Sequence, residues 1–458
     1  MDSNNIDPSV DLHPATEPGW RQRANEPSLP EAHRSVPIPK GMNFWRKLFA
    51  FSGPGFLVAV GYMDPGNWAT DIAGGSRYGY ALLSVIFISN FMAILLQSLC
   101  TKLGIATGRD LAQACRDHYS KPVNICLWLL CEVAICACDL AEVIGSAIAL
   151  NLLFHIPLVW GVCITALDVL IVMYLQHFGF RYLEALVVML ILTIGGCFLA
   201  EILIYKPEFS AVAAGIVPQA AILHDPKMLY IAIGILGATV MPHNLYLHSS
   251  IVQTRKYEHT PEGRKEAILF STIDSTLALM FALFINGAIL VVAGAAFYSK
   301  GEFAVEKIED AHKLMTPILG GASAAIFALA LLASGQNSTL TGTLAGQIVM
   351  EGFVNIRIRP WLRRLITRLF AIVPAVIVTL VYGESGTENL LIFSQVLLSL
   401  QLPFAIVPLI IFTSEKAKMG EFANGAFIKI ISWTVAAIII VLNVILLLYM
   451  AGVFKTPE

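Results

Sequence analysis

The sequence predicts an all-α polytopic membrane protein with eleven spans that contain an inverted repeat. Of its 458 residues, 57% are hydrophobic and only 14% are charged, whereas about 25% charge is usual in soluble proteins. Several stretches without Asp, Glu, Lys or Arg are long enough to cross about 30 Å of hydrocarbon. Two apolar segments are interrupted by proline-containing polar motifs, Asp64-Pro65-Gly66-Asn67 and Met241-Pro242-His243-Asn244. Paired interruptions of this kind are typical of inverted repeats built around a site at the middle of the membrane.

Each predicted span is an apolar stretch bounded by polar residues. The spans lie at about 47–72, 77–101, 123–152, 157–177, 182–205, 228–254, 268–298, 316–350, 364–383, 388–413 and 427–453. Spans 1–5 form a first repeat over about 45–205, spans 6–10 a second over about 228–413, and the helix at 427–453 is additional. Because each repeat has an odd number of spans, the second is inverted and the interrupted spans, 1 and 6, correspond. All belong to one transmembrane transporter domain over 43–458.

The distribution of basic residues predicts the orientation of the chain. With the N-terminus inside, 23 of the 30 Lys and Arg residues fall in inside segments, as the positive-inside rule requires. We therefore expect a cytoplasmic N-terminus and an extracytoplasmic C-terminus. Residues 1–42 are rich in Pro, Ser, Asn and charge and have no apolar core stretch. They are predicted to be a disordered cytoplasmic tail and not a signal peptide.

The first interruption offers oxygen ligands to a cation. An ionisable residue at membrane depth is costly and marks a functional site by default. Asp64 carries an anionic oxygen and Asn67 a neutral one, and Pro65 and Gly66 between them disfavour a regular helix. Both side chains can therefore turn toward one point. The alternative is a kink with a hydrogen-bonded Asp64, although a kink needs no carboxylate.

The second interruption adds a sulfur ligand. Thioether sulfur is a weak, soft ligand, and it offers nothing to Mg²⁺ or Ca²⁺, which bind oxygen. Met241 beside carboxylate and amide oxygens therefore suits Mn²⁺, Fe²⁺, Co²⁺ or Cd²⁺. Pro242 lacks an N–H, so the carbonyl of Ala238 loses its helical partner and is a further candidate ligand. The alternative is a methionine that fills a gap in the core.

Span 3 carries three acidic residues in an otherwise apolar run. Glu132, Asp139 and Glu142 fall within about 80° of one helical face. Buried carboxylates must be paired, protonated or hydrated, and Arg363 and Arg364 at the start of span 9 are candidate partners. This pattern predicts a proton relay, and a structural salt-bridge network is the alternative.

Other polar residues in the spans are less specific. His243 and His248 in span 6 are candidate ligands or proton carriers, unless both are hydrogen-bonded core residues. Gln395 and Gln401 lie in span 10, the repeat mate of span 5, where they could reach a midplane cavity.

Several protein classes are excluded by the motifs that the chain lacks. The sequence has no zinc-protease, nucleotide-binding or serine-hydrolase motif and no basic tract. Its eight cysteines have no zinc spacing and imply no disulfide framework. We expect neither an enzyme nor a prosthetic group, and neither nucleic acid nor a nucleotide as partner. The sequence carries no signal for an oligomeric state.

The two interrupted motifs together resemble the signatures of the natural resistance-associated macrophage protein (NRAMP) family, close to its bacterial proton-coupled manganese transporters. Three further runs agree with the resemblance: Asp139-Leu140-Ala141-Glu142, the run from Ala238 to Ser249, and the run from Ser394 to Phe404. It covers about residues 45–455 and leaves out the N-terminal tail.

The resemblance implies a LeuT-type fold and assigns roles to individual residues. The implied metal ligands are Asp64, Asn67, the carbonyl of Ala238, Met241 and Gln395. The implied proton pathway comprises Asp64, His243, Glu142, Asp139, Glu132, Arg363 and Arg364, with His248 nearby. The implied gating positions are Asn286 and the breaks at Pro65, Gly66 and Pro242. Because Met241 is retained, the chain shows no sign of the magnesium-selective branch, which lacks this methionine.

We therefore expect a multi-pass secondary transporter in a bacterial inner membrane. It would import Mn²⁺ and Fe²⁺, and also Cd²⁺ and Co²⁺, together with protons; the metals are its substrates and not cofactors. One alternative is a membrane metal sensor or metalloenzyme, which would bind metal without flux. Another is a LeuT-type amino acid carrier, in which Asp64 would repel the carboxylate of the substrate.

Overall fold

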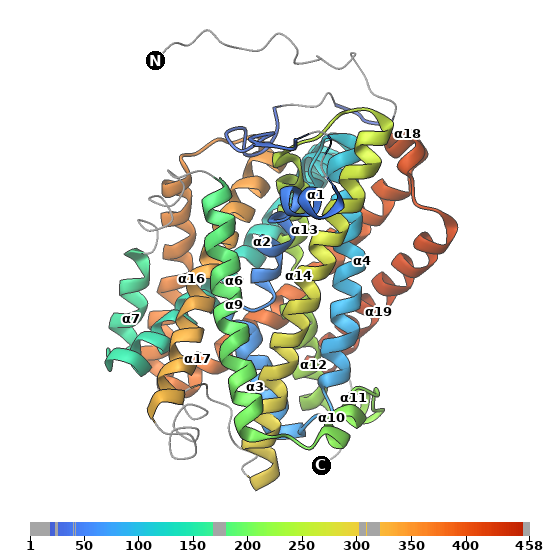
Figure 1. Cartoon of the computed structure of the whole chain (residues 1–458). Coiled ribbons are helices and arrows are strands. Elements are labelled where there is room, and N and C mark those ends of the chain that lie inside the picture. The colour runs from blue at the N-terminus through green and yellow to red at the C-terminus, as the bar shows by residue number, and fades with distance from the viewer. Residues whose placement is uncertain are drawn as a thin grey trace.

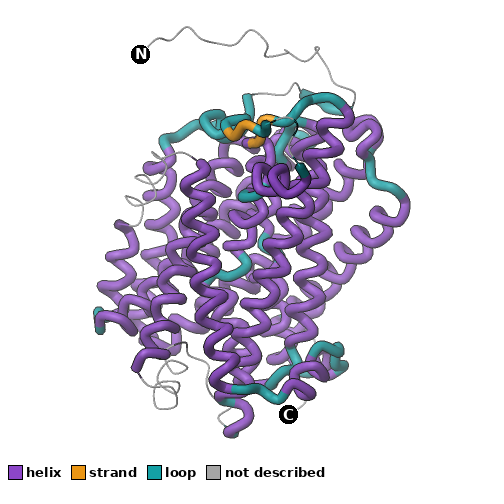
Figure 2. The backbone as a smooth tube through the Cα atoms, in the orientation of Figure 1, coloured by secondary structure: helices purple, strands orange, loops and turns teal. Residues whose placement is uncertain are grey.

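The computed structural model is a bundle of long helices (Figure 1). It describes residues 19–22, 26–39, 41, 43–167, 180–301, 308 and 321–451. A two-stranded parallel sheet lies at the N-terminal end, where β1 (Val36–Pro37) pairs with β2 (Arg255–Lys256). Figure 2 shows both strands outside the helical bundle.

The helices follow the order that the two predicted repeats require. Those of the first repeat are α1 (Phe44–Phe51), α2 (Pro54–Gly61), α3 (Pro65–Tyr78), α4 (Leu83–Thr107), α5 (Leu111–His118), α6 (Lys121–Phe154), α7 (Leu158–Ile164) and α9 (Phe180–Tyr205). Those of the second repeat are α12 (Pro226–Thr239), α13 (Pro242–Ile251), α14 (Pro261–Ala296), α16 (Gly321–Val354) and α17 (Pro360–Ser414), and α19 (Ala426–Met450) follows. Short helices connect them: α10 (Phe209–Gly215), α11 (Ala221–His224), α18 (Lys416–Met419), η1 (Thr165–Leu167), η2 (Val252–Thr254), η3 (Tyr298–Lys300) and η4 (Gly420–Phe422).

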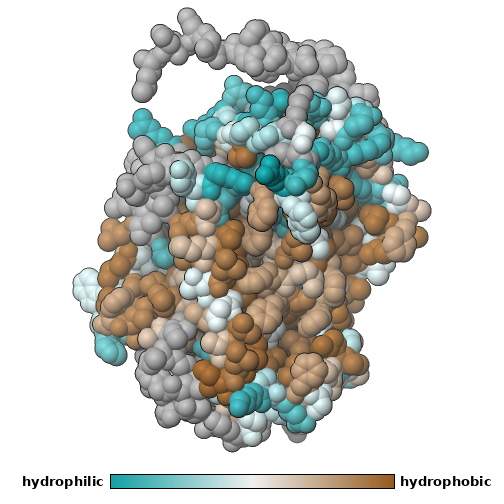
Figure 3. Space-filling model, viewed as in Figure 1, coloured by the Kyte–Doolittle hydropathy of each residue, from teal (hydrophilic) through white to brown (hydrophobic). Residues whose placement is uncertain are grey.

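The bundle is that of a multi-pass membrane protein. Within the described ranges, seven helices are long and apolar enough to cross a membrane. Figure 3 shows an apolar belt between two hydrophilic ends. Predicted span 4 coincides with α7 and η1 and then continues outside the described residues.

The last two spans of the second repeat differ from the expectation in one respect. We expected a connection at 384–387 between spans at 364–383 and 388–413, but α17 is helical throughout Pro360–Ser414. A straight helix of that length would measure about 80 Å, far more than one bilayer needs. The element α17 therefore corresponds to two predicted spans, and the four residues between them are helical as well.

Both predicted helix interruptions are confirmed. Between α2 and α3 the chain is not helical, as Figures 1 and 2 show at mid-height of the bundle. Asp64 caps α3 by accepting the backbone N–H of Asn67 at 2.8 Å. Pro65 and Pro242 are the first residues of α3 and α13, where the missing N–H of proline removes no helical hydrogen bond.

Polar side chains satisfy the carbonyls that the first interruption frees. The carbonyl of Tyr62 accepts Nδ2 of Asn286 at 2.7 Å. The carbonyl of Met63 accepts Oγ of Ser334 and, at 3.3 Å, Nε1 of Trp68. Irregular backbone is tolerated at membrane depth only where it is buried in protein or lines a cavity, and these bonds meet that condition. Asn286 and Ser334 come from α14 and α16, which hold the break in place, and Trp68 comes from α3 itself.

Part of the stretch that we expected to be disordered lies against the bundle. Trp20, Leu29, Ala32 and Val36 are all buried, and residues 1–18 lie outside the described residues. The composition of this stretch is polar, but its backbone and side chains bind helix ends elsewhere in the chain. Such long-range contacts leave no periodic pattern in the sequence.

Candidate functional site

The side-chain amide of Asn67 lies where three oxygen atoms converge at the first interruption. Its Nδ2 donates to Oδ1 of Asp64 at 2.8 Å, to the carbonyl of Ala238 at 3.1 Å and to the carbonyl of Gly61 at 3.3 Å. Asp64 and Ala238 are fully buried, and Asn67 is 1% exposed. The two broken helices therefore meet at a single point, and Asn67 joins them there.

These contacts leave cation-binding capacity unused. Among the described residues, Oδ2 of Asp64 is buried without a hydrogen-bond partner. Oδ1 of Asn67 lies 3.4 Å from Nδ2 of Asn286, and the assignment of amide O and N follows from the hydrogen-bond network alone. A cation in place of the amide protons would meet carboxylate and carbonyl oxygens, with the amide turned to present its own oxygen. This donor set fits a divalent ion.

The thioether of Met241 lies beside the same point. Met241 is fully buried, and Nδ2 of Asn244 lies 3.7 Å from its sulfur. A methyl group on Gly61 would stand 3.1 Å from the sulfur atom, and the carbonyl of Gly61 is one of the three oxygens bound by Asn67. The second interruption thus places its sulfur beside Gly61, whose carbonyl Asn67 binds.

Gln395 of α17 packs directly against the first interruption. A methyl group on Gly66 would stand only 1.9 Å from Nε2 of Gln395, so glycine is required for this approach. Nε2 donates to Oγ of Ser394 at 3.0 Å. Oε1 of Gln395 is buried and has no hydrogen-bond partner in the described part of the chain. Gln395 therefore presents an unpartnered amide oxygen in the part of the fold next to Gly66, and its ligand role stays a prediction.

The centre is not a cluster of strong metal ligands. The described residues contain no group of three or more His, Cys, Asp or Glu side chains that could hold a metal ion. Instead, one carboxylate is combined with amide, carbonyl and thioether groups. Such a set of mainly neutral donors suits an ion that is bound and then released from the site.

The acidic residues of α6 are paired with arginines of α17. Glu132 accepts Nη2 of Arg363 at 2.9 and 3.0 Å. Nη1 of Arg368 lies 3.6 Å from Oε2 of Glu142 and 3.9 Å from Oδ1 of Asp139. All but Glu132 are buried, so the network lies inside the protein.

Arg368 was missed by the sequence reasoning, which had proposed Arg363 and Arg364 as partners for all three carboxylates. In the described part of the chain, Arg363 forms an ion pair with Glu132. The side chain of Arg364 lies outside the described residues. Arg368 also donates to Oγ1 of Thr339 at 2.6 Å, and Thr339 in turn binds Glu142 at 3.1 Å. An arginine inside a predicted span was itself the signal, because such a residue is costly without a partner.

The two histidines of α13 lie in different surroundings. Nδ1 of His243 is buried and has no partner among the residues that the structure describes. Nδ1 of His248 lies 2.9 Å from Oε1 of Gln97, whose Nε2 donates to the hydroxyl of Tyr62 at 2.9 Å. His248 is therefore linked through α4 to the first interruption and not to the carboxylates of α6. The sequence reasoning had singled out neither Gln97 nor Tyr62.

One further acidic residue of α3 escaped the sequence reasoning. Asp71 lies four residues after Asn67, on the same helical face. It is 1% exposed, and its Oδ2 has no hydrogen-bond partner in the described ranges. Its position inside a long apolar run was the missed signal.

A second polar cluster, which we call the inner seal, fixes the start of α2. It comprises Ser52, Gly53, Glu184, Arg255 and Asp274. Arg255 binds Glu184 at 2.7 and 3.1 Å and also donates to the carbonyl of Ser52. Asp274 accepts the N–H of Gly53 at 3.3 Å. The inner seal lies at the end of the bundle where β2, which contains Arg255, pairs with β1.

The chain is similar to proteins of one family throughout this region. Residues 55–449 match the family model described as natural resistance-associated macrophage protein-like. A divalent metal cation transporter MntH of Listeria monocytogenes is 65% identical over 435 residues, which is 95% of this chain and 97% of that protein. A MntH of Nostoc sp. is 64% identical over 425 residues, 93% of this chain and 96% of that protein.

Solved structures agree with this likeness. A crystal structure of an Eremococcus coleocola manganese transporter superposes with a TM-score of 0.85 at 42% identity, covering 94% of this chain and 93% of that one. The nucleobase-cation-symport-1 transporter Mhp1, in a closed conformation, gives a TM-score of 0.60 at 14% identity, covering 98% and 97%. The second likeness concerns the fold alone, which is the predicted LeuT-type fold.

Proposed function

Because this chain belongs to the natural resistance-associated macrophage protein family, we propose that it imports divalent transition metals in symport with protons. Mn²⁺ and Fe²⁺ are the main proposed substrates, with Cd²⁺ and Co²⁺ as further ions that the site accepts. The proposed membrane is a bacterial inner membrane, with the N-terminus in the cytoplasm and the C-terminus outside.

The observation that carries this proposal is the oxygen cluster around Asn67 with a sulfur atom beside it. Asp64, Asn67 and the carbonyl of Ala238 make direct contact, and Met241 lies against Gly61 at the same point. Oxygen alone would serve Mg²⁺ and Ca²⁺. Soft sulfur adds affinity for borderline metals only, so Met241 provides the discrimination.

Proton coupling is proposed from the groups next to the metal site. A divalent cation binds the ionised carboxylate of Asp64, so a proton held there has to leave when metal binds. His243 follows Met241 closely on α13, and the α6 carboxylates Glu142, Asp139 and Glu132 lead away from the site. Arg363, Arg364 and Arg368 would balance their charge. We propose this path for the proton.

Alternating access is proposed to occur by movement of the two broken helices against the rest of the bundle. The metal ligands are buried in this structure, and the inner seal joins the start of α2 to α9, α14 and β2. Release of the ion to the cytoplasm would require these bonds to break. Asn286, which binds Tyr62 and lies 3.4 Å from Asn67, would be the matching contact on the outer side.

Mn²⁺ uptake into proteoliposomes that contain the purified chain tests the proposal. We expect saturable uptake that is lost in Asp64→Asn and kept in Asp225→Asn, a carboxylate that caps α12 near the end of the bundle. Metal binding without uptake would support the sensor or metalloenzyme alternative. Uptake of amino acids would support the carrier alternative.

A further inference from the structure

A segment outside the matched family region lies across the N-terminal end of the bundle. We call the described residues 19–22 and 26–39 the N-terminal strap. The family model begins at residue 55, so the strap lies outside the residues that the model matches. Figure 1 shows it in dark blue at the N-terminal end, next to α1.

The middle of the strap binds α5 and its N-cap. Oγ of Ser28 donates to Oδ2 of Asp110 at 2.6 Å, and both residues are buried. Nε2 of Gln113 donates to the carbonyl of Glu26 at 3.1 Å. Asp110 also caps α5 by accepting the N–H of Gln113. Ser28 therefore adds a second hydrogen bond to the residue that caps α5, in the connection between α4 and α6.

Two backbone N–H groups attach the strap to the second repeat. That of Leu29 donates to Oε2 of Glu351 near the end of α16 at 3.0 Å. That of Arg34 donates to the carbonyl of Gln253 in η2 at 3.0 Å, and Val36 then pairs with Arg255 in the sheet. The strap thus joins α5, α16 and the inner end of the second broken span, which are separate elements of the bundle.

The backbone of the strap is held in an unfavourable conformation. Leu29 and Arg34 have φ values of 54° and 53°, in the left-handed region that residues with a side chain avoid. Such conformations persist only where the surrounding contacts impose them, and they cluster at switch regions. The contacts of Leu29 and Arg34 are therefore strong enough to hold the strap, while the strained backbone favours its release.

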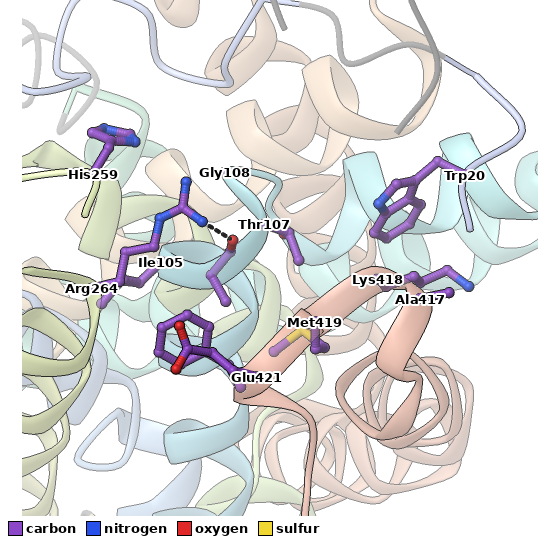
Figure 4. A pocket seen from close by; sticks show the side chains of 13 residues that line it. Trp20, Ile105, Thr107, Gly108, His259, Arg264, Ala417, Lys418, Met419 and Glu421 are labelled. Carbon is purple, nitrogen blue, oxygen red and sulfur yellow. Dashed lines mark hydrogen bonds between the residues drawn. The ribbon is translucent and has the colours of Figure 1, made fainter. Parts of the chain in front are cut away.

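The beginning of the strap covers a cavity. The ring of Trp20 lies 4.6 Å from the guanidinium carbon of Arg109 and 5.2 Å from Nζ of Lys418. Below it is a cavity of about 320 Å³ whose lining includes Trp20, Arg264 and Glu421. Figure 4 shows Trp20 and Lys418 on one side of this space and Arg264 on the other. Trp20 is itself buried and packs against Phe412, with 5.8 Å between the ring centroids, so the start of the strap is anchored beside this cavity.

The strap is connected to the inner seal through one residue. Arg255 pairs with Val36 of the strap through its backbone, and its side chain binds Glu184 and the carbonyl of Ser52. Movement of α2 away from the seal would break the bonds of Arg255. Contacts that form in only one of two conformations stabilise that conformation by the free energy of those contacts.

We propose that the N-terminal strap is a latch that holds the cytoplasmic side of the transporter closed. The inference rests on the proposed transport function and adds a regulatory element to it. With the strap docked, the inner ends of both broken spans are tied to α5, α16 and α9. When the strap undocks, the inner seal loses the pairing of Val36 with Arg255, and the population of the inside-open state increases.

Hydrogen–deuterium exchange of the full-length protein in nanodiscs tests the latch without requiring transport. Ser28→Asp places a second carboxylate against buried Asp110, and Ser35→Asp adds the same charge at an exposed position of the strap. We expect exchange at residues 53–61 and 251–256 to be faster than wild type by about tenfold or more in S28D, because like charges held together in a desolvated contact shift an equilibrium strongly. S35D is expected to match the wild type.

Two results would contradict the latch. In one, residues 26–34 exchange faster in S28D while 53–61 and 251–256 do not, so that the strap covers the seal without holding it. In the other, no segment changes in S28D. If S28D does not fold, Trp20→Ala with exposed Gln22→Ala as its control makes the same comparison. A protein that exchanges as expected but takes up no Mn²⁺ would contradict the proposed function and leave the latch supported.

Discussion

Nδ2 of Asn67 lies 2.8 Å from Oδ1 of Asp64, and the same nitrogen reaches the carbonyl of Ala238 at 3.1 Å. An amide donor therefore occupies the point at which the ligands from both broken helices converge. The arrangement explains how a buried carboxylate and a carbonyl at the C-terminal end of α12 are kept together when no cation joins them. Under the proposed function, Asn67 would have to turn its amide to bind metal, which would couple the two halves of the site.

Met241→Ala is expected to reduce discrimination against Ca²⁺ while some Mn²⁺ transport remains. Removal of the sulfur leaves a site of oxygen ligands, which Ca²⁺ accepts. We expect the ratio of Mn²⁺ to Ca²⁺ uptake to fall by about tenfold, equal to about 1.4 kcal/mol. Met228→Ala, a buried methionine near the start of α12, is the control. Unchanged exclusion of Ca²⁺ in M241A would remove the sulfur from the selectivity mechanism.

Gly66→Ala is expected to act through Gln395. The added methyl group would stand 1.9 Å from Nε2 of Gln395, and the flexible side chain would be displaced. G66A and Q395A should therefore weaken Mn²⁺ binding to a similar degree, and the double variant should be no weaker than either, because coupled residues are not additive. Calorimetric titration with Mn²⁺ measures this. Additive losses would show that Gly66 acts independently of Gln395.

Arg368→Gln is expected to destabilise the protein strongly. It would leave Glu142 and Asp139 without the guanidinium that lies 3.6 and 3.9 Å away, and breaking a buried ion pair costs about 3–5 kcal/mol. Adding Glu142→Gln should restore part of the loss, since it removes the uncompensated charge. Thermal unfolding in detergent is the measurement. A single variant as stable as the wild type would show that Arg368 does not balance these carboxylates.

The docking of the strap is expected to depend on pH through Asp110. Burial raises the pKa of its carboxyl from 3.8 to about 6, against an opposing hydrogen bond from Ser28. A raised pKa gives the docked state stability that is complete below pH 3.8 and is lost as the pH rises through about 6. His33 has the opposite effect on the pH dependence of docking. Burial, with a smaller effect of Arg34, lowers its pKa from 6.5 to about 4, so its contribution to the docked state is lost as the pH falls.

The two effects are separated by substitution. In His33→Gln, protection of the Leu29 amide, corrected for intrinsic exchange, should decline as the pH rises from about 4 to 6. In the double variant with Asp110→Asn this decline should disappear. Protection that increases with pH in His33→Gln would contradict the assignment to Asp110.

The sequence was most informative where a residue type is unusual for the apolar segment that contains it. Asp64 and Met241 next to prolines in apolar runs predicted both interruptions, because proline and carboxylate are costly there wherever the rest of the chain lies. The ligand role of these two residues stays a prediction. The contacts of the strap could not be predicted in this way. Ser28 and Leu29 look like parts of a polar tail, and they acquire their role only from Asp110 and Glu351, which are far away in the chain.

Pairing across the bundle was likewise only partly predictable. The need for positive partners of the α6 carboxylates followed from burial, but the choice of Arg368 depends on how α17 lies against α6. The link from His248 to Tyr62 through Gln97 depends in the same way on how α13 lies against α4. The helical periodicity of the sequence does not reveal which residues of different helices lie in contact.

The central claim is that metal entry and proton entry are coupled. It is tested most directly by a pH-sensitive dye inside proteoliposomes that contain the purified chain, with metal added outside at a fixed membrane potential. The account predicts internal acidification on addition of Mn²⁺, Fe²⁺, Cd²⁺ or Co²⁺, none on addition of Ca²⁺ or Mg²⁺, and none with Asp64→Asn. Mn²⁺ uptake at the wild-type rate without any acidification would contradict it.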